Sequence, residues 1–157
     1  MKLTQVILFT LITISFISCS KKKQRNQDFL PPLEIKVPVI LTGDPEVFDF
    51  IISSENDVNK FSDNIEMITI EGKETINGNL DSLSIIDGLT IAKIMLDFYS
   101  NSTKLQNTIN EFDKYMYDLK YSNSINEEQF KEMKIISQNY KDRVTTLEHK
   151  YTEYYKR

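Results

Sequence analysis

Two heptad patterns in the C-terminal half constrain the fold of this 157-residue chain more than any other feature. Residues 81–121 contain no proline and one glycine, and their apolar side chains recur at alternating spacings of four and three. That spacing is typical of a long helix with one buried seam. The core positions are Ile91, Met95, Phe98, Ser102, Leu105, Ile109, Phe112, Met116 and Leu119.

A second seam follows a polar break at residues 121–124. Ser124 and Glu127 have the spacing of a capping box, which predicts a new helix start. The core positions of this helix are Phe130, Met133, Ser137, Tyr140, Val144, Leu147, Tyr151 and Tyr154. Two seams joined by a short loop predict an antiparallel, coiled-coil-like two-helix hairpin over residues 81–157.

The loop also sets the register of the hairpin. Folding back at residues 121–124 brings Phe98 near Tyr151 and Leu105 near Val144, and it places Ser137 opposite Phe112. A large residue facing a small one is a sensible packing choice.

Residues 33–80 predict a small helical head. Asp44 is placed to cap a helix that begins at Pro45, and Ser54 is placed to start a second short helix. Residues 33–37 alternate apolar and polar side chains and residues 39–41 are continuously apolar, but Pro38 limits this stretch to a short edge strand or an extended segment against helices. Residues 33–157 would thus form one mainly α domain.

The first third of the long helix differs from the rest. Residues 83–98 are apolar around most of the circumference, which predicts burial on all sides. The two short helices of the head and the segment around Val39 would provide the cover. A pocket around Phe48, Phe61 and Leu89 is a possible ligand site within this head.

The N-terminus has the layout of a signal peptide: a positive start, an apolar stretch too short to span a bilayer, and a small residue at Ser18. Phe16-Ile17-Ser18-Cys19 resembles the lipobox of bacterial lipoproteins. The resemblance implies removal of residues 1–18 and acylation of Cys19, including palmitate. The alternative is that Cys19, the only cysteine, is a free thiol in a secreted protein cut elsewhere.

Residues 19–32 predict a tether between the lipid and the domain. They are mostly polar and end in Pro31-Pro32, so they bury little apolar area. By resemblance to Gram-negative lipoproteins, Ser20 implies sorting to the outer membrane, with the protein facing the periplasm. The basic residues 21–25 either touch anionic headgroups or are simply solvated.

Charge and motifs exclude several classes of function. Residues 33–157 hold 14 basic and 22 acidic residues, a balance that would repel nucleic acid. His149 is the only histidine and lies off the core seam, so we expect no metal site and no cofactor. The acidic cluster Glu127, Glu128 and Glu132 is explained by its place at a helix N-terminus. No catalytic motif is present, and we expect no enzyme activity.

The tyrosines are the remaining candidates for a binding site. Exposed tyrosine is enriched at protein interfaces, so the candidate partner-binding residues are Tyr117, Tyr121 and Tyr155. The alternative is that they only cover the edges of the hairpin. The sequence therefore predicts a structural or accessory component of an envelope assembly, such as a secretion machine, that binds a protein partner or itself. The alternative function is a lipoprotein that binds lipid or a small ligand.

Overall fold

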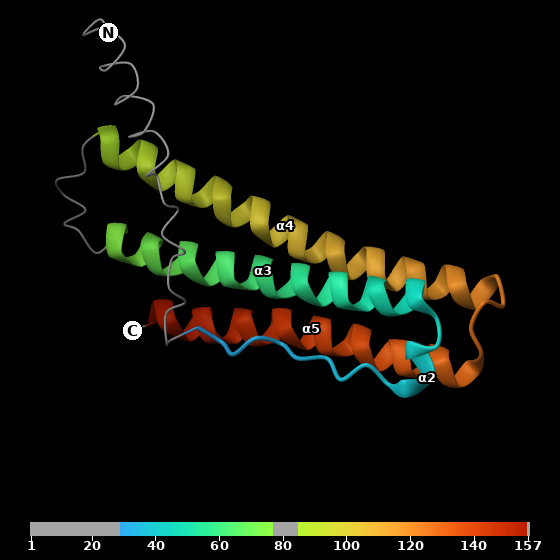
Figure 1. The fold of residues 1–157 in the computed structure, drawn as a ribbon. Coiled ribbons are helices and arrows are strands. Elements are labelled where there is room, and N and C mark those ends of the chain that lie inside the picture. Colours follow the sequence, from blue (N-terminus) through green and yellow to red (C-terminus); the bar gives the residue numbers. More distant parts are fainter. Residues whose placement is uncertain (1–28, 77–84, 157) are drawn as a thin grey trace, which may run out of the picture.

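The computed structural model describes residues 29–76 and 85–156, which are mainly helical and contain no strand. The helices are α2 (Val39–Thr42), α3 (Pro45–Ile76), α4 (Ile85–Tyr121) and α5 (Glu127–Lys156). Figure 1 shows the three long helices side by side, with α4 running opposite to α3 and α5. The predicted mainly α fold and the helical hairpin, formed by α4 and α5, are confirmed.

The predicted head is instead one continuous helix of 32 residues. The expectation of two short helices was wrong, because Ser54 does not cap a helix but lies buried inside α3. Val47, Ile51, Val58 and Ile65 are buried at heptad spacing, so the two expected apolar faces are parts of one seam. No proline or glycine interrupts the helix before Gly72. Consequently α3 runs along the hairpin and does not form a compact head at its end.

The start of α3 is as the sequence predicts. Asp44 accepts hydrogen bonds through Oδ1 from the backbone N–H groups of Glu46, at 3.0 Å, and Val47, at 3.3 Å. Pro45 occupies the first helical position, where its missing N–H costs nothing. This cap fixes the point at which the chain turns back along the bundle.

Residues 29–38 form an extended segment and no edge strand, and α2 occupies residues 39–42. The side chain of Asn59 takes the place of a neighbouring strand: it accepts from the N–H of Leu33 at 2.7 Å and donates to the carbonyl of Leu33 at 2.9 Å. Arg143 of α5 donates to the carbonyl of Pro31 at 2.8 Å. The packed part of the chain thus begins before Leu33 and includes the end of the predicted tether.

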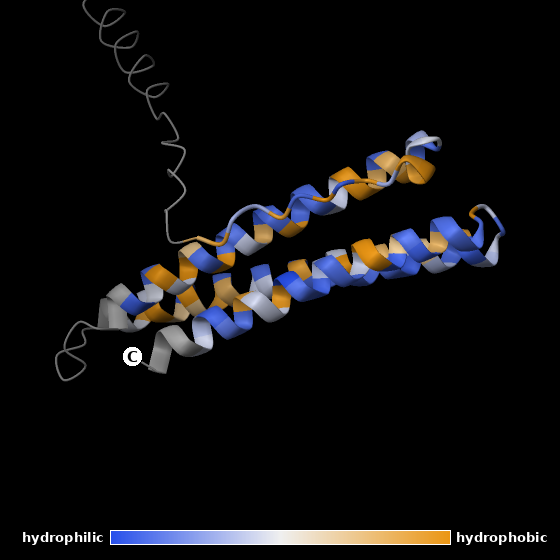
Figure 2. Cartoon of the chain, turned by 90° about the horizontal axis from the view of Figure 1, so that it is seen from below, coloured by the Kyte–Doolittle hydropathy of each residue, from blue (hydrophilic) through white to orange (hydrophobic). Residues whose placement is uncertain are grey.

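The core lies where α3, α4 and α5 face one another, and Figure 2 shows apolar positions recurring along all three. Phe112 of α4 is central: its ring stacks at 5.8 Å from Phe50 and meets Tyr140 edge-on at 5.1 Å. The hydroxyl of Tyr140 donates to the carbonyl of Ile51 at 3.1 Å. These aromatic contacts connect all three helices in one layer.

The predicted register of the hairpin agrees with the contacts. Ser137 donates a hydrogen bond to Asp113, one residue from its expected neighbour Phe112. Lys141, one turn further along α5, lies 2.7 Å from the other carboxylate oxygen of Asp113. Phe98, Leu105, Val144 and Tyr151 line one groove of about 340 Å³, as their predicted pairing requires.

The predicted burial of the first third of α4 is wrong. Leu89, Met95, Leu96 and Tyr99 are 68%, 67%, 69% and 72% exposed. The physical reason is the straight path of α3, which covers one side of α4, while no second helix of the described residues covers the other side. The pocket expected around Phe48, Phe61 and Leu89 does not form either. Phe50, two residues after Phe48 on α3, packs against Phe112 of α4. Leu89 precedes Phe112 by 23 residues on α4, which places it about 35 Å away along the helix.

Candidate functional site

The turn between α4 and α5 has a defined backbone conformation. Asn123 has a φ of 58°. The N–H of Ser124 donates to the carbonyl of Leu119 at 2.9 Å, and that of Asn123 donates to Lys120 at 3.2 Å. This pair of bonds is a Schellman motif, which satisfies free carbonyls at a helix end. It ends α4 at a fixed angle.

The start of α5 is fixed just as firmly, but not by the predicted residue. Asn126, and not Ser124, is the cap: Asn126 and Gln129 exchange hydrogen bonds of 2.9 Å between side chains and backbone N–H groups. Gln129 also donates to the carbonyl of Ile40 at 3.1 Å. The turn is therefore held to the N-terminal segment, and Ile125 within it is buried.

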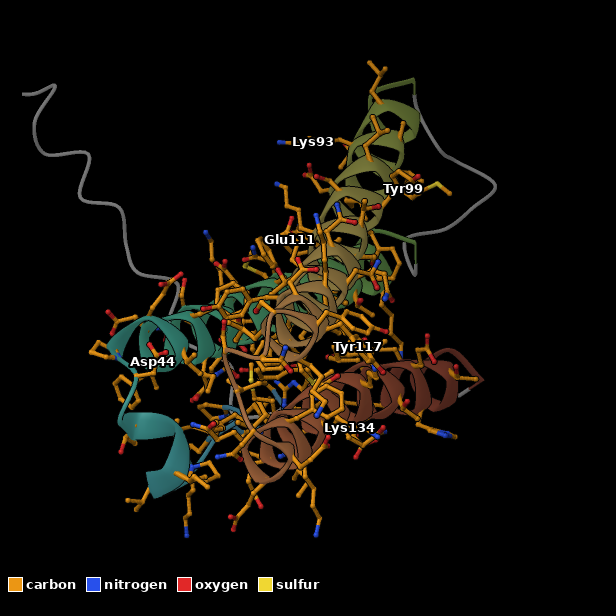
Figure 3. All side chains as sticks on the ribbon, turned by 90° about the vertical axis from the view of Figure 1, so that its right-hand side faces the viewer. Asp44, Lys93, Tyr99, Glu111, Tyr117 and Lys134 are labelled. Atoms are coloured by element: carbon orange, nitrogen blue, oxygen red, sulfur yellow. The ribbon has the colours of Figure 1, made fainter. Side chains whose placement is uncertain are left out.

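A group of aromatic and basic side chains lies beside this turn, and we call it the tip cluster. It comprises Tyr117, Lys120, Tyr121, Phe130 and Lys134. The rings of Tyr117 and Tyr121 are 6.2 Å apart, and Tyr117 meets Phe130 edge-on at 5.5 Å. The ammonium groups of Lys120 and Lys134 lie 5.5 and 5.9 Å from the centre of the Phe130 ring. Tyr117 and Lys134 are labelled in Figure 3, in a view towards this end of the molecule.

Much of the tip cluster is open to solvent. Tyr121 is 80% exposed and Tyr117 is 42% exposed. Along α5 the cluster continues into a shallow groove of about 570 Å³. It is lined by Phe130, Ile135, Gln138, the exposed residues Lys131 and Lys134, and Glu127, which pairs with Lys120. Stacked aromatic surface beside cationic groups suits a protein partner that supplies apolar and acidic side chains.

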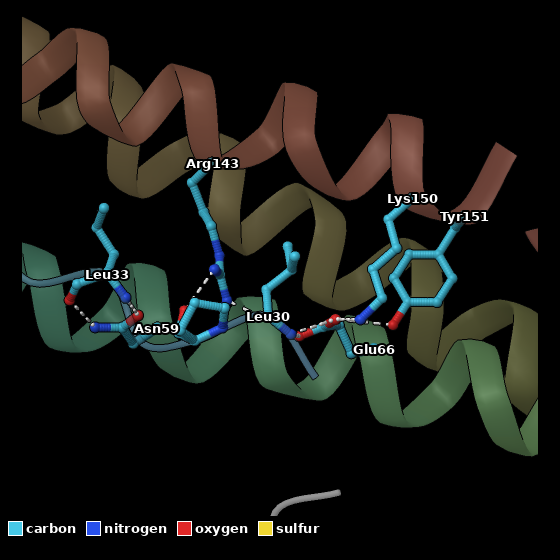
Figure 4. A network of polar contacts seen from close by, with 8 residues as sticks. Leu30, Leu33, Asn59, Glu66, Arg143, Lys150 and Tyr151 are labelled. Carbon is cyan, nitrogen blue, oxygen red and sulfur yellow. Dashed lines mark hydrogen bonds and ion pairs between the residues drawn. The ribbon is translucent and has the colours of Figure 1, made fainter. Parts of the chain in front are cut away.

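A second polar arrangement lies near the opposite end of the bundle, and we call it the Glu66 network. Both carboxylate oxygens of Glu66 accept from the N–H of Leu30 at 3.0 Å. Lys150 lies 2.6 Å away and the hydroxyl of Tyr151 donates at 2.9 Å, while Arg143 approaches to 3.9 Å (Figure 4). The Glu66 side chain is fully buried, so its charge depends on these partners.

The Glu66 network is best explained as a structural fastening. A buried carboxylate can do acid–base work, but here two neutral donors and two cations, from the N-terminal segment and α5, occupy its surroundings. It joins the start of the packed chain to α3 and α5. The chain thus enters the bundle at this end, which we call the base, and the turn after α4 forms the tip.

Two tyrosines among the described residues have raised pKa values. Burial raises the pKa of the Tyr140 phenol, and the nearby Glu55 carboxylate raises it further. Burial also raises the pKa of Tyr115, helped by the negative charges of Glu46 and Asp44. His149 is exposed, and Glu127 pairs with Lys120 at the turn. Within residues 29–76 and 85–156 no group of three His, Cys, Asp or Glu side chains is arranged to hold a metal ion.

The structure brings two of the three selected tyrosines together. Tyr117 and Tyr121 stack one turn apart on α4, as the one-turn spacing predicts. The side chain of Tyr155 and the whole of Cys19 lie outside the described residues. Lys134 was missed because a lone lysine in a helix carries no signal. Glu66 was missed because a single acidic residue among apolar core positions looks like a break in the apolar pattern and not like a buried site.

The described helices include none with both the length and the apolar character needed to cross a lipid bilayer. The chain matches no known protein family, and no curated protein or solved structure is significantly similar to it.

Proposed function

We propose that this protein is a non-enzymatic lipoprotein, anchored through Cys19 to the outer membrane and facing the periplasm, that binds a protein partner within an envelope assembly such as a secretion machine. The observation that carries the proposal is the separation of two surfaces. The chain enters the bundle beside Glu66 at the base, and the exposed tip cluster lies at the far end of α4.

The dimensions support a spacer that presents the tip to a partner. The 37 residues of α4 correspond to about 55 Å of helix. An anchor near the base leaves Tyr117 and Tyr121 free to contact a partner at the opposite end of the bundle. The firmly capped turn would hold these rings in a defined orientation, which lowers the entropy lost on binding.

The composition of the tip supports a protein partner over a small ligand. Tyr121 projects from the surface and encloses no cavity, and the groove beside Phe130 is shallow and flanked by lysines. Aromatic residues at a protruding end are typical of hot spots in protein interfaces.

Site-specific photocrosslinking in cells that make the full chain tests this proposal. A photoreactive residue in place of Tyr121 is expected to give a discrete protein adduct. The same residue in place of Glu111, which is exposed on α4 ten residues before Tyr121, is expected to give none. Tyr117→Ala should abolish the adduct at position 121, whereas Lys114→Ala, also exposed on α4, should leave it unchanged.

Two further outcomes bear on the proposal. Cys19→Ala should move the protein from the membrane fraction to the soluble fraction, and retention in the membrane would count against lipid anchoring. Crosslinking at position 121 only to lipid or to no molecule would count against the partner-binding tip. A lipid adduct would favour the alternative of a lipid-binding lipoprotein.

A further inference from the structure

The first third of α4 carries an exposed apolar face, which we call the base stripe. It consists of Leu89, Ala92, Met95, Leu96 and Tyr99, at spacings that place all five side chains on one side of the helix. Four of them are large and more than two-thirds exposed. Monomeric soluble proteins rarely expose a contiguous apolar surface of this kind without a use for it.

The other sides of this segment are distinct. Ile91, Ile94 and Phe98 turn towards α3 and, with Ile68, Thr69 and Gly72, line an apolar groove of about 480 Å³. Met95 and Tyr99 of the base stripe also line this groove, so the stripe and the groove are continuous. Thr90, Lys93 and Asp97 form the polar side, and Figure 3 shows Lys93 and Tyr99 leaving α4 in opposite directions. The segment is therefore an amphipathic helix whose apolar side is only partly covered by its own protein.

The base stripe and the groove lie near the point where the N-terminal segment joins the bundle, and this proximity indicates what covers them. Leu30 is bonded to Glu66, and Ile68 and Gly72 of the groove follow Glu66 within two turns of α3. Ten residues separate Cys19 from Phe29, a link of at most about 35 Å when fully extended. This length exceeds the roughly 10–12 Å diameter of a helix, so the tether can pass around α3.

We infer that the base stripe and the adjoining groove rest on the lipid bilayer to which Cys19 is anchored, so that the protein contacts the membrane through its own side chains as well as through its lipid. The inference rests on the proposed lipid anchor. A tyrosine among aliphatic residues on one helix side, with charged residues on the other, suits the interface between headgroups and acyl chains.

The anchor also explains how a short stripe suffices. A helix side of this size would bind a bilayer only weakly alone, but the tether keeps it within tens of ångströms of the surface. The second contact then becomes intramolecular, with an effective concentration set by the length of the link.

The chain has no tryptophan, so a single introduced indole reports on its own surroundings. We would purify the full-length protein from membranes as Tyr99→Trp and Tyr121→Trp variants, both at highly exposed positions. Each is reconstituted into vesicles of phosphatidylethanolamine and phosphatidylglycerol, with or without phosphatidylcholine brominated on its acyl chains. Bromine quenches only an indole that reaches the acyl region.

The Tyr99→Trp variant is expected to show blue-shifted emission and to lose most of it in brominated vesicles. The Tyr121→Trp variant should emit equally in both kinds of vesicle. Unquenched emission from Tyr99→Trp in protein that floats with the vesicles overturns the inference. A blue shift that grows with protein density and is insensitive to bromine also overturns it, because a second copy would then cover the stripe.

Mass spectrometry of the N-terminal peptide separates this failure from failure of the proposed function. If Cys19 is acylated and the indole at position 99 is not quenched, the membrane contact of the stripe is refuted but the lipid anchor is not. Absence of acyl chains on Cys19 removes the lipid anchor, and with it the inference.

Discussion

The backbone N–H of Leu30 and the carboxylate of Glu66 are 36 residues apart in sequence and 3.0 Å apart in space. This contact determines where the packed chain begins. The carboxylate is fully buried and also meets Lys150 and Tyr151 of α5. One acidic side chain thus joins the entry of the chain to two helices.

Removal of this carboxylate is expected to destabilise the whole domain. Glu66→Ala removes the negative charge that faces Lys150 and Arg143. Loss of one partner of a buried ion pair lowers the free energy of unfolding by about 3–5 kcal/mol. Urea denaturation followed by circular dichroism would measure the change. Because that loss can unfold the protein, Tyr151→Phe provides a milder test, with an expected cost of about 1.5–3 kcal/mol for a hydrogen bond to a charged group.

Glu111→Ala is the matched control on an exposed helix surface, and its effect should stay within about 0.5 kcal/mol. If Glu66→Ala behaved like this control, the network would not be a structural fastening.

Two buried serines are expected to respond to alanine in opposite directions. Ser62 is fully buried on α3, and its hydroxyl has no hydrogen-bond partner among the described residues. Ser62→Ala should stabilise the protein by up to about 1 kcal/mol, since an unsatisfied polar group is removed and helix propensity improves. Ser137→Ala loses the bond to Asp113 and should cost about 1 kcal/mol. Thermal unfolding of the two variants and the wild type would measure the changes in stability. Changes in the same direction would contradict the prediction.

The turn at the tip depends on the left-handed conformation of Asn123. Asn123→Gly should retain full stability, because glycine adopts this conformation without steric cost. Asn123→Ala should lose about 1 kcal/mol, since a Cβ is unfavourable there. Denaturation midpoints measure both variants. The same Asn123→Ala change should weaken crosslinking at position 121, and an unaltered adduct would show that the turn does not orient the tip cluster.

Alkaline pH is expected to destabilise the domain through Tyr140. Burial raises the pKa of this phenol in the folded state, and the Glu55 carboxylate adds to the shift. The stabilisation is therefore complete below the ordinary tyrosine pKa of about 10 and is lost as the pH rises above it, where the unfolded chain ionises first. Stability measured between neutral and strongly alkaline pH should fall less steeply in Tyr140→Phe than in wild type. Tyr121→Phe, changed at an exposed ring, should follow the wild-type curve.

The hairpin could be predicted because its information is local and periodic. The seam from Leu105 to Met116 and the seam of α5 repeat every seven residues, and the loop between them allows only one way of folding back. The cap at Asp44 was equally predictable, since a capping side chain bonds to residues two and three positions away.

The path of α3 could not be predicted with the same rules. Ser54 has the local features of a helix start, and nothing nearby distinguishes a cap from a serine buried inside a longer helix. The choice is made by packing, because one straight helix buries Val47, Ile51 and Val58 against the hairpin. The exposure of Leu89 and Tyr99 follows from that choice and was unpredictable for the same reason.

The candidate site was predictable in part. The spacing of Tyr117 and Tyr121 places them together on any helix. Their meeting with Phe130 and Lys134 depends on the angle of the turn, which is set by the conformation of Asn123 and the cap at Asn126. The Glu66 network joins residues 36 to 85 positions apart, and no local pattern encodes such a separation.

The direction of the N-terminal segment determines how the domain bears mechanical load. From Leu30 the chain runs along α3 and α5 towards the tip before α3 turns back, as Figure 1 shows. A pull between the tip and the point where the chain enters at the base would act along this segment. The bonds at Glu66, Asn59 and Arg143 are then loaded together in shear, so they resist as a group. The same bonds pulled sideways would open one after another, so the domain is mechanically strongest along its own long axis.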